Sequence, residues 1–194
     1  MNRYESTSTY MIDKLKAGLR SSLSYHGLHH VLDVLTAAEM IGAKENISAQ
    51  EMELLKVAVL FHDAGFIVDS VEHEKRGCAM AKESLPGFGY NEKEIEAICG
   101  MIMATQYPPH PKNLMEQIIC DADLDYLGRD DYYRISETLF KELTHFGLLK
   151  GEQDWNKLQE KFLSGHRYFK KTSRELREPK KSEHLDHVKR LITS

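Results

Sequence analysis

Two adjacent residues with chemical potential, His62 and Asp63, close the most apolar stretch of the chain, AVLFHDAG. A polar pair placed there loses its hydration unless it meets polar partners or a metal ion. Histidine is also favoured at the C-terminus of a helix, where it faces the negative end of the dipole, and aspartate in the turn that follows. The pair therefore needs further residues before it indicates a metal site.

A second candidate segment holds two histidines. His26 and His30 are four residues apart at the start of an expected helix, so both imidazoles should project from one face. That spacing suits two metal ligands, or one metal ligand beside a group that donates a proton in catalysis. His29 lies about 100° around the same helix and should point elsewhere.

A third segment, IICDADLDYLGRDD, places Asp121, Asp123 and Asp125 after an apolar run. Carboxylates that follow a buried helix are costly unless they are paired or bound to metal. A solvated acidic turn and a calcium loop are the alternatives. An EF-hand calcium loop requires glycine at its sixth position and glutamate at its twelfth, where this segment has Tyr126 and Tyr132.

The elements that position these residues are expected to be helices, because apolar residues recur at intervals of three and four. A capping box of Ser48 and Glu51 opens the apolar helix that Gly65 should end, and Gly27 and Gly42 should bracket the helix before it. No segment alternates with period two, so we predict an all-α, compact helical bundle with little or no sheet. The expected helices are 8–23, 28–41, 48–65, 72–85, 92–104, 113–127, 132–146, 154–169 and 183–192.

Composition favours a single domain with a small-molecule partner. The chain has 194 residues, of which 41% are hydrophobic and 29% charged, enough to bury a core. A net charge of -4 and a pI near 6.2 argue against a dedicated nucleic-acid binder. The sequence does not decide the oligomeric state, and an oligomer stays possible.

Location and redox environment follow from two further features. No apolar stretch approaches the roughly 20 residues that a membrane span needs, and the first residues lack the pattern of a secretory signal. We therefore expect a cytoplasmic protein without membrane contact. Cys78, Cys99 and Cys120 are widely spaced and form no CxxC pair, so we expect buried free thiols.

Taken in order, the three segments resemble the HD superfamily of metal-dependent phosphohydrolases. The family pattern is a histidine, then a His-Asp pair, then a distant aspartate on an all-helical core. The resemblance spans about residues 25–130 and includes YHGLHHVLDVL, AVLFHDAGF, the dipeptide His73-Glu74 and DADLDYLG. It implies one HD-type domain over residues 1–194, with the core motifs at about 25–130 and peripheral helices at about 131–194.

The resemblance also implies a ligand set. His30, His62, Asp63 and Asp123 match the family's metal ligands, and Asp121 is the alternative to Asp123 if the register differs by a turn. Histidine and carboxylate ligands accept manganese, iron, cobalt, nickel, magnesium or zinc, so the identity of the divalent ion stays open.

Related cyclic-nucleotide phosphodiesterases carry a similar Tyr-His-Asn motif, whose histidine protonates the leaving oxygen. His26 stands at that position and Gly27 replaces the asparagine, which weakens a specific phosphodiesterase assignment. We predict that His26 is the general acid and that Asp63 serves catalysis as well as metal binding.

A second metal ion is less expected than one. Family members with two metals add histidines after the His-Asp pair. His73 could serve, but Thr105 and Gln106 stand where another histidine would often be found, and His110 is a weaker alternative.

Five residues near the expected ligands are candidates for supporting the metal or orienting the substrate: His73, Glu74, Asp121, Asp125 and Arg129. Lys75 and Arg76 could reach a phosphate or could belong to a solvated face. The remaining histidines, at 145, 166, 184 and 187, lack acidic partners at ligand spacing and are expected at the surface.

The resemblance implies a phosphohydrolase in which a metal-activated water attacks the phosphorus of a small-molecule phosphate ester, plausibly a nucleotide. Three alternatives stay open: a cyclic-nucleotide phosphodiesterase, a regulatory module that binds metal without turnover, and a two-iron oxygenase that would need further histidines. The sequence does not separate monoesters, diesters and triphosphates.

Overall fold

The computed structural model describes residues 2–193, and regular structure in that part of the chain is entirely helical. The predicted all-α fold is therefore confirmed, and no β-strand occurs in these residues. Short 3-10 helices follow three of the α-helices: η1 (Ala64–Ile67), η2 (Leu85–Phe88) and η3 (Asp125–Gly128). The α-helices are α1 (Arg3–Gly18), α2 (Leu28–Lys44), α3 (Ala49–His62), α4 (His73–Ser84), α5 (Glu92–Ala104), α6 (Leu114–Asp123), α7 (Tyr132–His145), α8 (Glu152–Gly165) and α9 (Lys171–Thr193).

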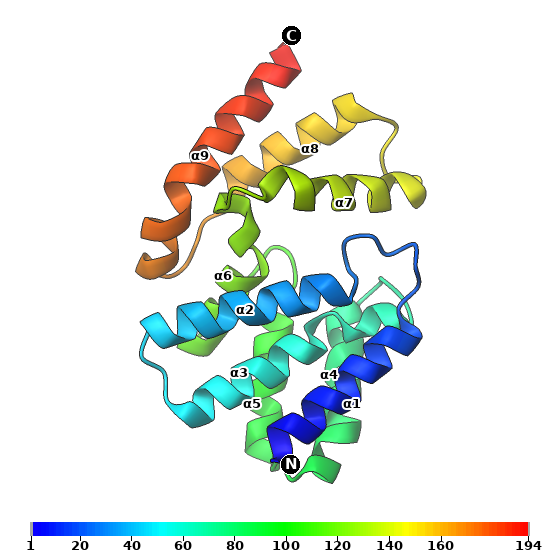
Figure 1. The fold of residues 1–194 in the computed structure, drawn as a ribbon, viewed down its shortest axis with the longest axis vertical. Helices are drawn as coiled ribbons and strands as arrows, with labels where there is room; N and C mark the ends of the chain where they lie inside the picture. The colour runs from blue at the N-terminus through cyan, green and yellow to red at the C-terminus, as the bar shows by residue number, and fades with distance from the viewer. Residues whose placement is uncertain (1, 194) are drawn as a thin grey trace.

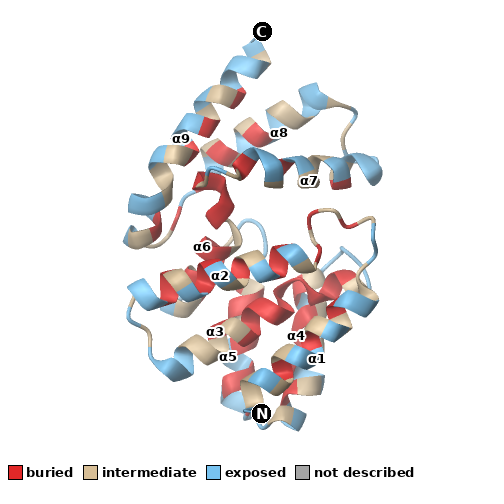
Figure 2. Ribbon diagram, in the orientation of Figure 1, coloured by how far each residue is buried: buried red, intermediate tan, exposed pale blue. Residues whose placement is uncertain are grey.

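Helix α3 forms the centre of the larger half of the molecule. It packs against α1, α2, α4 and α5, and residues 57–66 are all buried. Figure 2 shows buried residues concentrated on α3 and its neighbours. The predicted buried helix thus delivers His62 and Asp63 to the interior. We call this assembly of α1–α6 the apolar body.

The rest of the chain, residues 125–193, forms what we call the C-terminal region. Its helices α7, α8 and α9 lie at the end of the long axis opposite the start of α1 (Figure 1). Helix α9 packs on α8 and on η3. A Cβ on Gly128 would lie 2.2 Å from the carbonyl oxygen of Arg177, so only glycine permits this close approach of η3 to α9.

Several predicted boundaries are wrong. Helix α1 covers residues 3–18 and not 8–23, because a capping box between Asn2 and Glu5 opens it earlier. Gly42 lies inside α2, which continues to Lys44. Helix α3 ends at His62, before Gly65.

The last helix differs most from its prediction. It begins at Lys171, 12 residues before the expected start at 183, and contains Pro179. One proline removes a single backbone hydrogen bond, and buried residues hold the helix on both sides of it. Ser173 precedes Pro179, and Lys181, His184 and Val188 follow it. His166 and His184 are buried as well, so their expected surface location is wrong.

Two other expectations concern thiols and membranes. All three cysteines are buried and free, as predicted. Within residues 2–193, no helix combines the length and apolarity that crossing a bilayer requires.

Candidate metal centre

Three predicted ligands from three helices converge at the centre of the molecule. His30 comes from α2, His62 from the end of α3 and Asp123 from the end of α6, and one ligand atom from each lies within 4.8 Å of the others. The Nε2 atom of His30 is 3.1 Å from Asp123 Oδ1, and His62 Nε2 is 3.7 Å from the same oxygen. These separations leave room for a shared cation.

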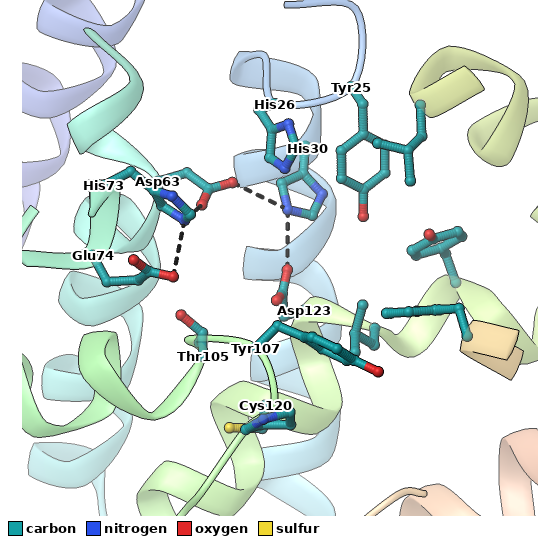
Figure 3. Close-up of a pocket in the computed structure, with 15 residues that line it drawn as sticks. Tyr25, His26, His30, Asp63, His73, Glu74, Thr105, Tyr107, Cys120 and Asp123 are labelled. Carbon is teal, nitrogen blue, oxygen red and sulfur yellow. Dashed lines mark ion pairs between the residues drawn. The ribbon is translucent and has the colours of Figure 1, made fainter. Parts of the chain in front are cut away.

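The fourth predicted ligand, Asp63, adjoins this cluster (Figure 3). Its Oδ2 lies 3.5 Å from His30 Nε2 and 3.3 Å from His62 Nε2. Within the described residues, both Asp63 Oδ2 and His62 Nε2 are buried without a hydrogen-bond partner. Unpaired buried polar atoms are costly, and a cation bound between them would satisfy both. The donor set of two imidazoles and two carboxylates therefore fits a divalent metal ion.

A hydrogen bond orients His62, and the nearby carboxylates affect its protonation. Its Nδ1 donates to the carbonyl oxygen of Val59 at 2.7 Å, which directs Nε2 toward the cluster. Burial disfavours a charged ring, but the negative charges of Asp63 and Asp123 outweigh it and raise the pKa of His62 to about 9. Although burial favours neutral carboxyls, the neighbouring histidines lower the pKa of Asp63 and Asp123.

The other oxygen of Asp63 faces His73. His73 Nε2 lies 3.4 Å from Asp63 Oδ1 and 3.3 Å from Glu74 Oε1. The close packing of α4 on η1 depends on Gly65, because a Cβ at this position would lie 2.0 Å from the His73 carbonyl oxygen. His73 and Glu74 thus adjoin the predicted ligands, as expected from the sequence, whereas His110 is exposed and lies outside the cavity lining.

Glu142, which no sequence motif predicted for the site, positions His26 through hydrogen bonds. Glu142, on α7, accepts from the backbone N–H groups of Tyr25 and His26 at 2.7 and 3.1 Å. Its Oε1 lies 2.5 Å from His26 Nδ1. Burial opposes the charged ring, but Glu142 and the nearby Asp63 raise the pKa of His26. No motif pointed to Glu142, which is 116 residues from His26 on a largely exposed helix.

Several of these side chains, including His26 and three of the four predicted ligands, line a cavity of about 210 Å³. Figure 3 shows His26, His30, Asp63, His73 and Asp123 around it. The ring of His26 stacks on Phe66, with centroids 4.2 Å apart. Since Nδ1 of His26 faces Glu142, its Nε2 is the nitrogen left for a molecule in the cavity.

Three predicted support residues lie elsewhere. Asp121 is two positions from Asp123, about 200° around the helix, and accepts from the backbone N–H groups of Phe169 and Lys170. Asp125 accepts from Arg177 at 2.7 Å. Asp121 therefore ties α6 to the C-terminal region, and Asp125 ties η3 to α9 within that region. Neither carboxylate lines the cavity.

Arg129, the third of these residues, points away from the cavity too. Its guanidinium donates to Asp131 and Asp33 at 2.9 Å each. The sequence placed these residues near the site because they follow Asp123 closely, but the turn of η3 redirects their side chains toward α2 and α9.

Comparison with known proteins gives a family and a fold. Residues 27–125 match the HD domain family. An uncharacterized protein from Clostridium beijerinckii is 33% identical over 76 residues. That match covers 38% of this chain and 48% of the relative, so it spans about half of the relative's length.

Three solved structures share the fold. A predicted HD superfamily hydrolase from an uncultured Thermotogales bacterium has a TM-score of 0.64 and 18% identity, with 95% of this chain and 91% of that chain covered. Bacillus subtilis YpgQ in complex with ADP has a TM-score of 0.62 and 20% identity, with 95% of both chains covered. A Lactobacillus plantarum protein has a TM-score of 0.65 and 16% identity, covering 98% and 97%.

Proposed function

Because the chain belongs to the HD domain family, we propose that it is a metal-dependent phosphohydrolase acting on a small-molecule phosphate ester, with nucleotides as the leading class. The observation that carries the proposal is the cluster of His30, His62 and Asp123 with Asp63 beside it, in which two buried polar atoms lack partners. Such a set is costly to bury for structural reasons alone. Three of the four residues, His30, Asp63 and Asp123, line a cavity where a substrate can reach them.

The four ligands leave positions free on a five- or six-coordinate divalent ion. When bound, such an ion lowers the pKa of a coordinated water and offsets the charge of phosphoryl oxygens. His30 and His62 would hold it with Nε2, and Asp63 and Asp123 would supply two negative charges. His73 contacts Oδ1 of Asp63 from the other side, and Glu74 contacts the same nitrogen of His73.

His26 supplies the proton that the leaving oxygen needs. Its raised pKa keeps the ring protonated to higher pH than an ordinary histidine, and a group poised near the working pH is an effective acid. Glu142 holds Nδ1 and so fixes which nitrogen faces the cavity. The acid is therefore oriented before substrate binds.

Support for a nucleotide is of two kinds. YpgQ, which shares this fold, was crystallised with ADP. In this chain, Tyr25, Tyr107, Tyr126 and Phe162 line the cavity, and aromatic side chains stack on planar bases. Both observations make nucleotides the first compounds to test.

The test compares the parent chain with Asp63→Ala and with Asp13→Ala, a matched control whose side chain is 71% exposed on α1. Each protein is loaded with manganese, its bound metal is measured by elemental analysis, and it is screened for phosphate release from nucleotides, monoesters and diesters. We expect the parent and Asp13→Ala to bind metal and release phosphate. Asp63→Ala should lose both, since removing a ligand leaves the other buried charges unpaired.

Other outcomes separate the alternatives. Metal bound by the parent without turnover of any compound would favour a regulatory module. Two irons per chain together with oxygen uptake would favour an oxygenase. Equal activity of the parent and Asp63→Ala would contradict the proposed site.

A further inference from the structure

The cavity beside the candidate metal centre is poor in positive charge. Asp63, Glu74 and Asp123 place three carboxylates in its wall. Among the residues that the structure describes, no lysine or arginine lines it. Phosphate chains are usually bound by lysine and arginine side chains that neutralise their charge. Apart from a metal ion, only histidines could do so here.

The nearby cationic residues are engaged elsewhere. Lys75 pairs with Glu72, and Arg76 donates to the carbonyl oxygen of Val71. Neither side chain lines the cavity, which leaves no cation at the position where the sequence suggested a phosphate contact.

The opposite wall is aromatic and aliphatic. Tyr107 and Phe162 lie with ring centroids 5.4 Å apart, and Tyr126, Leu124 and Leu139 complete this side. Figure 3 shows Tyr107 across the cavity from Asp63 and Glu74. A substrate bound at the metal ligands would therefore direct its remaining atoms toward apolar surface.

A second cavity continues this wall into the C-terminal region. It has about 210 Å³, and Tyr126, Leu139 and Phe162 line it as well as the first cavity. Most of its other lining residues, such as Trp155 and Leu158, are apolar. Since an apolar cavity of roughly 150 Å³ holds benzene, this space is large enough for an aromatic ring.

We infer that the substrate carries one phosphoryl group on a leaving group that contains an aromatic ring, as in an aryl phosphate or a nucleoside monophosphate, and does not carry a phosphate chain. This inference rests on the proposed function and narrows it. In the reaction, the oxygen of water bonds to phosphorus, the ester P–O bond breaks, and the leaving oxygen takes a proton. The products are inorganic phosphate and an alcohol.

The first experiment measures kcat/KM of the manganese-loaded parent for the mono-, di- and triphosphate of one nucleoside, and for phenyl phosphate against glycerol phosphate. We expect the monophosphate to exceed the triphosphate by about tenfold or more, because each added phosphate brings charge to a carboxylate-rich wall. Phenyl phosphate should exceed glycerol phosphate by about tenfold, an ordinary effect for an apolar group in a fitting pocket.

Two variants test the two walls separately. Thr105→Lys places a cation in the cavity and should raise kcat/KM for the diphosphate relative to the monophosphate. Phe162→Ala should lower kcat/KM for phenyl phosphate about tenfold and leave glycerol phosphate nearly unchanged. The control, Phe88→Ala, removes another half-buried phenylalanine, one that stacks on Tyr10 and lies outside both cavities.

The possible failures are distinguishable. The triphosphate could release phosphate at a rate equal to or greater than the monophosphate, and Phe162→Ala could leave the rates unchanged. That result would overturn this inference but not the proposed phosphohydrolase activity. No release from any compound by the metal-loaded parent would remove the proposed function itself. If Phe162→Ala and Phe88→Ala reduced the selectivity for phenyl phosphate equally, the role of the apolar wall in substrate selection would also be contradicted.

Discussion

The apolar body and the C-terminal region are held together by different interactions. In the body, the buried residues of α3 and α5 are mostly apolar, and they form one continuous core. The C-terminal region has only a small cluster around Tyr126, Tyr132, Leu163 and Val188. Many of its buried side chains are polar or charged: Asp125, Ser136, Glu142, Gln159, His166, Ser173, Lys181 and His184. Apolar burial is the main stabilising interaction in the first region, whereas the second depends more on specific pairing.

The candidate site uses both regions for different purposes. All four predicted metal ligands come from the body, which fixes their positions by dense packing. The C-terminal region supplies Glu142 behind His26 and three members of the apolar wall, Tyr126, Leu139 and Phe162. We therefore expect the apolar body to hold the metal ligands and the C-terminal region to influence which substrate is selected.

The largest expected effect is a cavity in the body. Leu60 is fully buried in α3, and Leu60→Ala should lower the free energy of unfolding by about 3 to 5 kcal/mol. Denaturant titration followed by circular dichroism measures the change. The exposed Leu191 of α9 gives the control, since Leu191→Ala should change stability by less than about 0.5 kcal/mol. Equal effects of the two substitutions would contradict the distinction between the regions.

A smaller loss should follow from breaking a buried ion pair in the C-terminal region. Asp125→Ala leaves Arg177 without its partner at 2.7 Å and should cost about 3 kcal/mol, the lower end for a buried pair. Hydrogen exchange should show the added opening confined to α8 and α9. Asp186→Ala, an exposed aspartate on α9, should leave exchange unchanged. Opening that spreads equally into α3 would show that the two regions unfold as one unit.

Next in size is a pH effect confined to the C-terminal region. Burial, together with Lys181 and Arg167, lowers the pKa of His166 to about 3, and Lys181 Nζ lies 3.3 Å from its Nδ1. Between that value and the ordinary pKa near 6.5, the unfolded chain binds a proton that the folded chain does not. Stability is therefore present above about pH 6.5 and lost as the pH falls.

The expected size is about 1.4 kcal/mol per pH unit, or roughly 2 kcal/mol between pH 6.5 and 5. His166→Gln keeps an acceptor for Lys181 but cannot titrate, so its stability should fall less over this range. Denaturant titrations at several pH values give the difference between the two proteins. Parallel pH curves for the parent and the variant would show that His166 has the same pKa in the folded and the unfolded chain.

These differences explain what the sequence could predict. The helix at 92–104 was predicted with its observed bounds because Asn91 caps an apolar pattern of regular period. Asp123 was chosen over Asp121 by family resemblance, and the helix geometry supports that choice. Periodicity found only the last part of α9, residues 183–192, because most of the buried side chains of this helix are polar. It could not find Glu142, whose partner is far along the chain. Contacts that depend on pairing between distant residues leave no periodic signal.

The smallest expected effect tests the contact that joins the two regions at the site. Glu142→Gln keeps an oxygen for the backbone N–H groups of Tyr25 and His26 but removes the negative charge beside His26 Nδ1. As a general acid, His26 must be protonated, so activity falls as the pH rises through its pKa. Loss of the carboxylate removes a cause that raises this pKa, and the basic limb of the pH profile should move to lower pH.

We expect kcat at neutral pH to fall about tenfold, equivalent to about 1.4 kcal/mol in the barrier, with little change in KM. Glu137→Gln, on the same helix and paired only with Lys141 at the surface, is the control. A change confined to packing would alter stability without moving the basic limb, so the pH profile separates the two roles. An unmoved limb in Glu142→Gln would mean that the C-terminal region shapes the cavity but does not tune the acid.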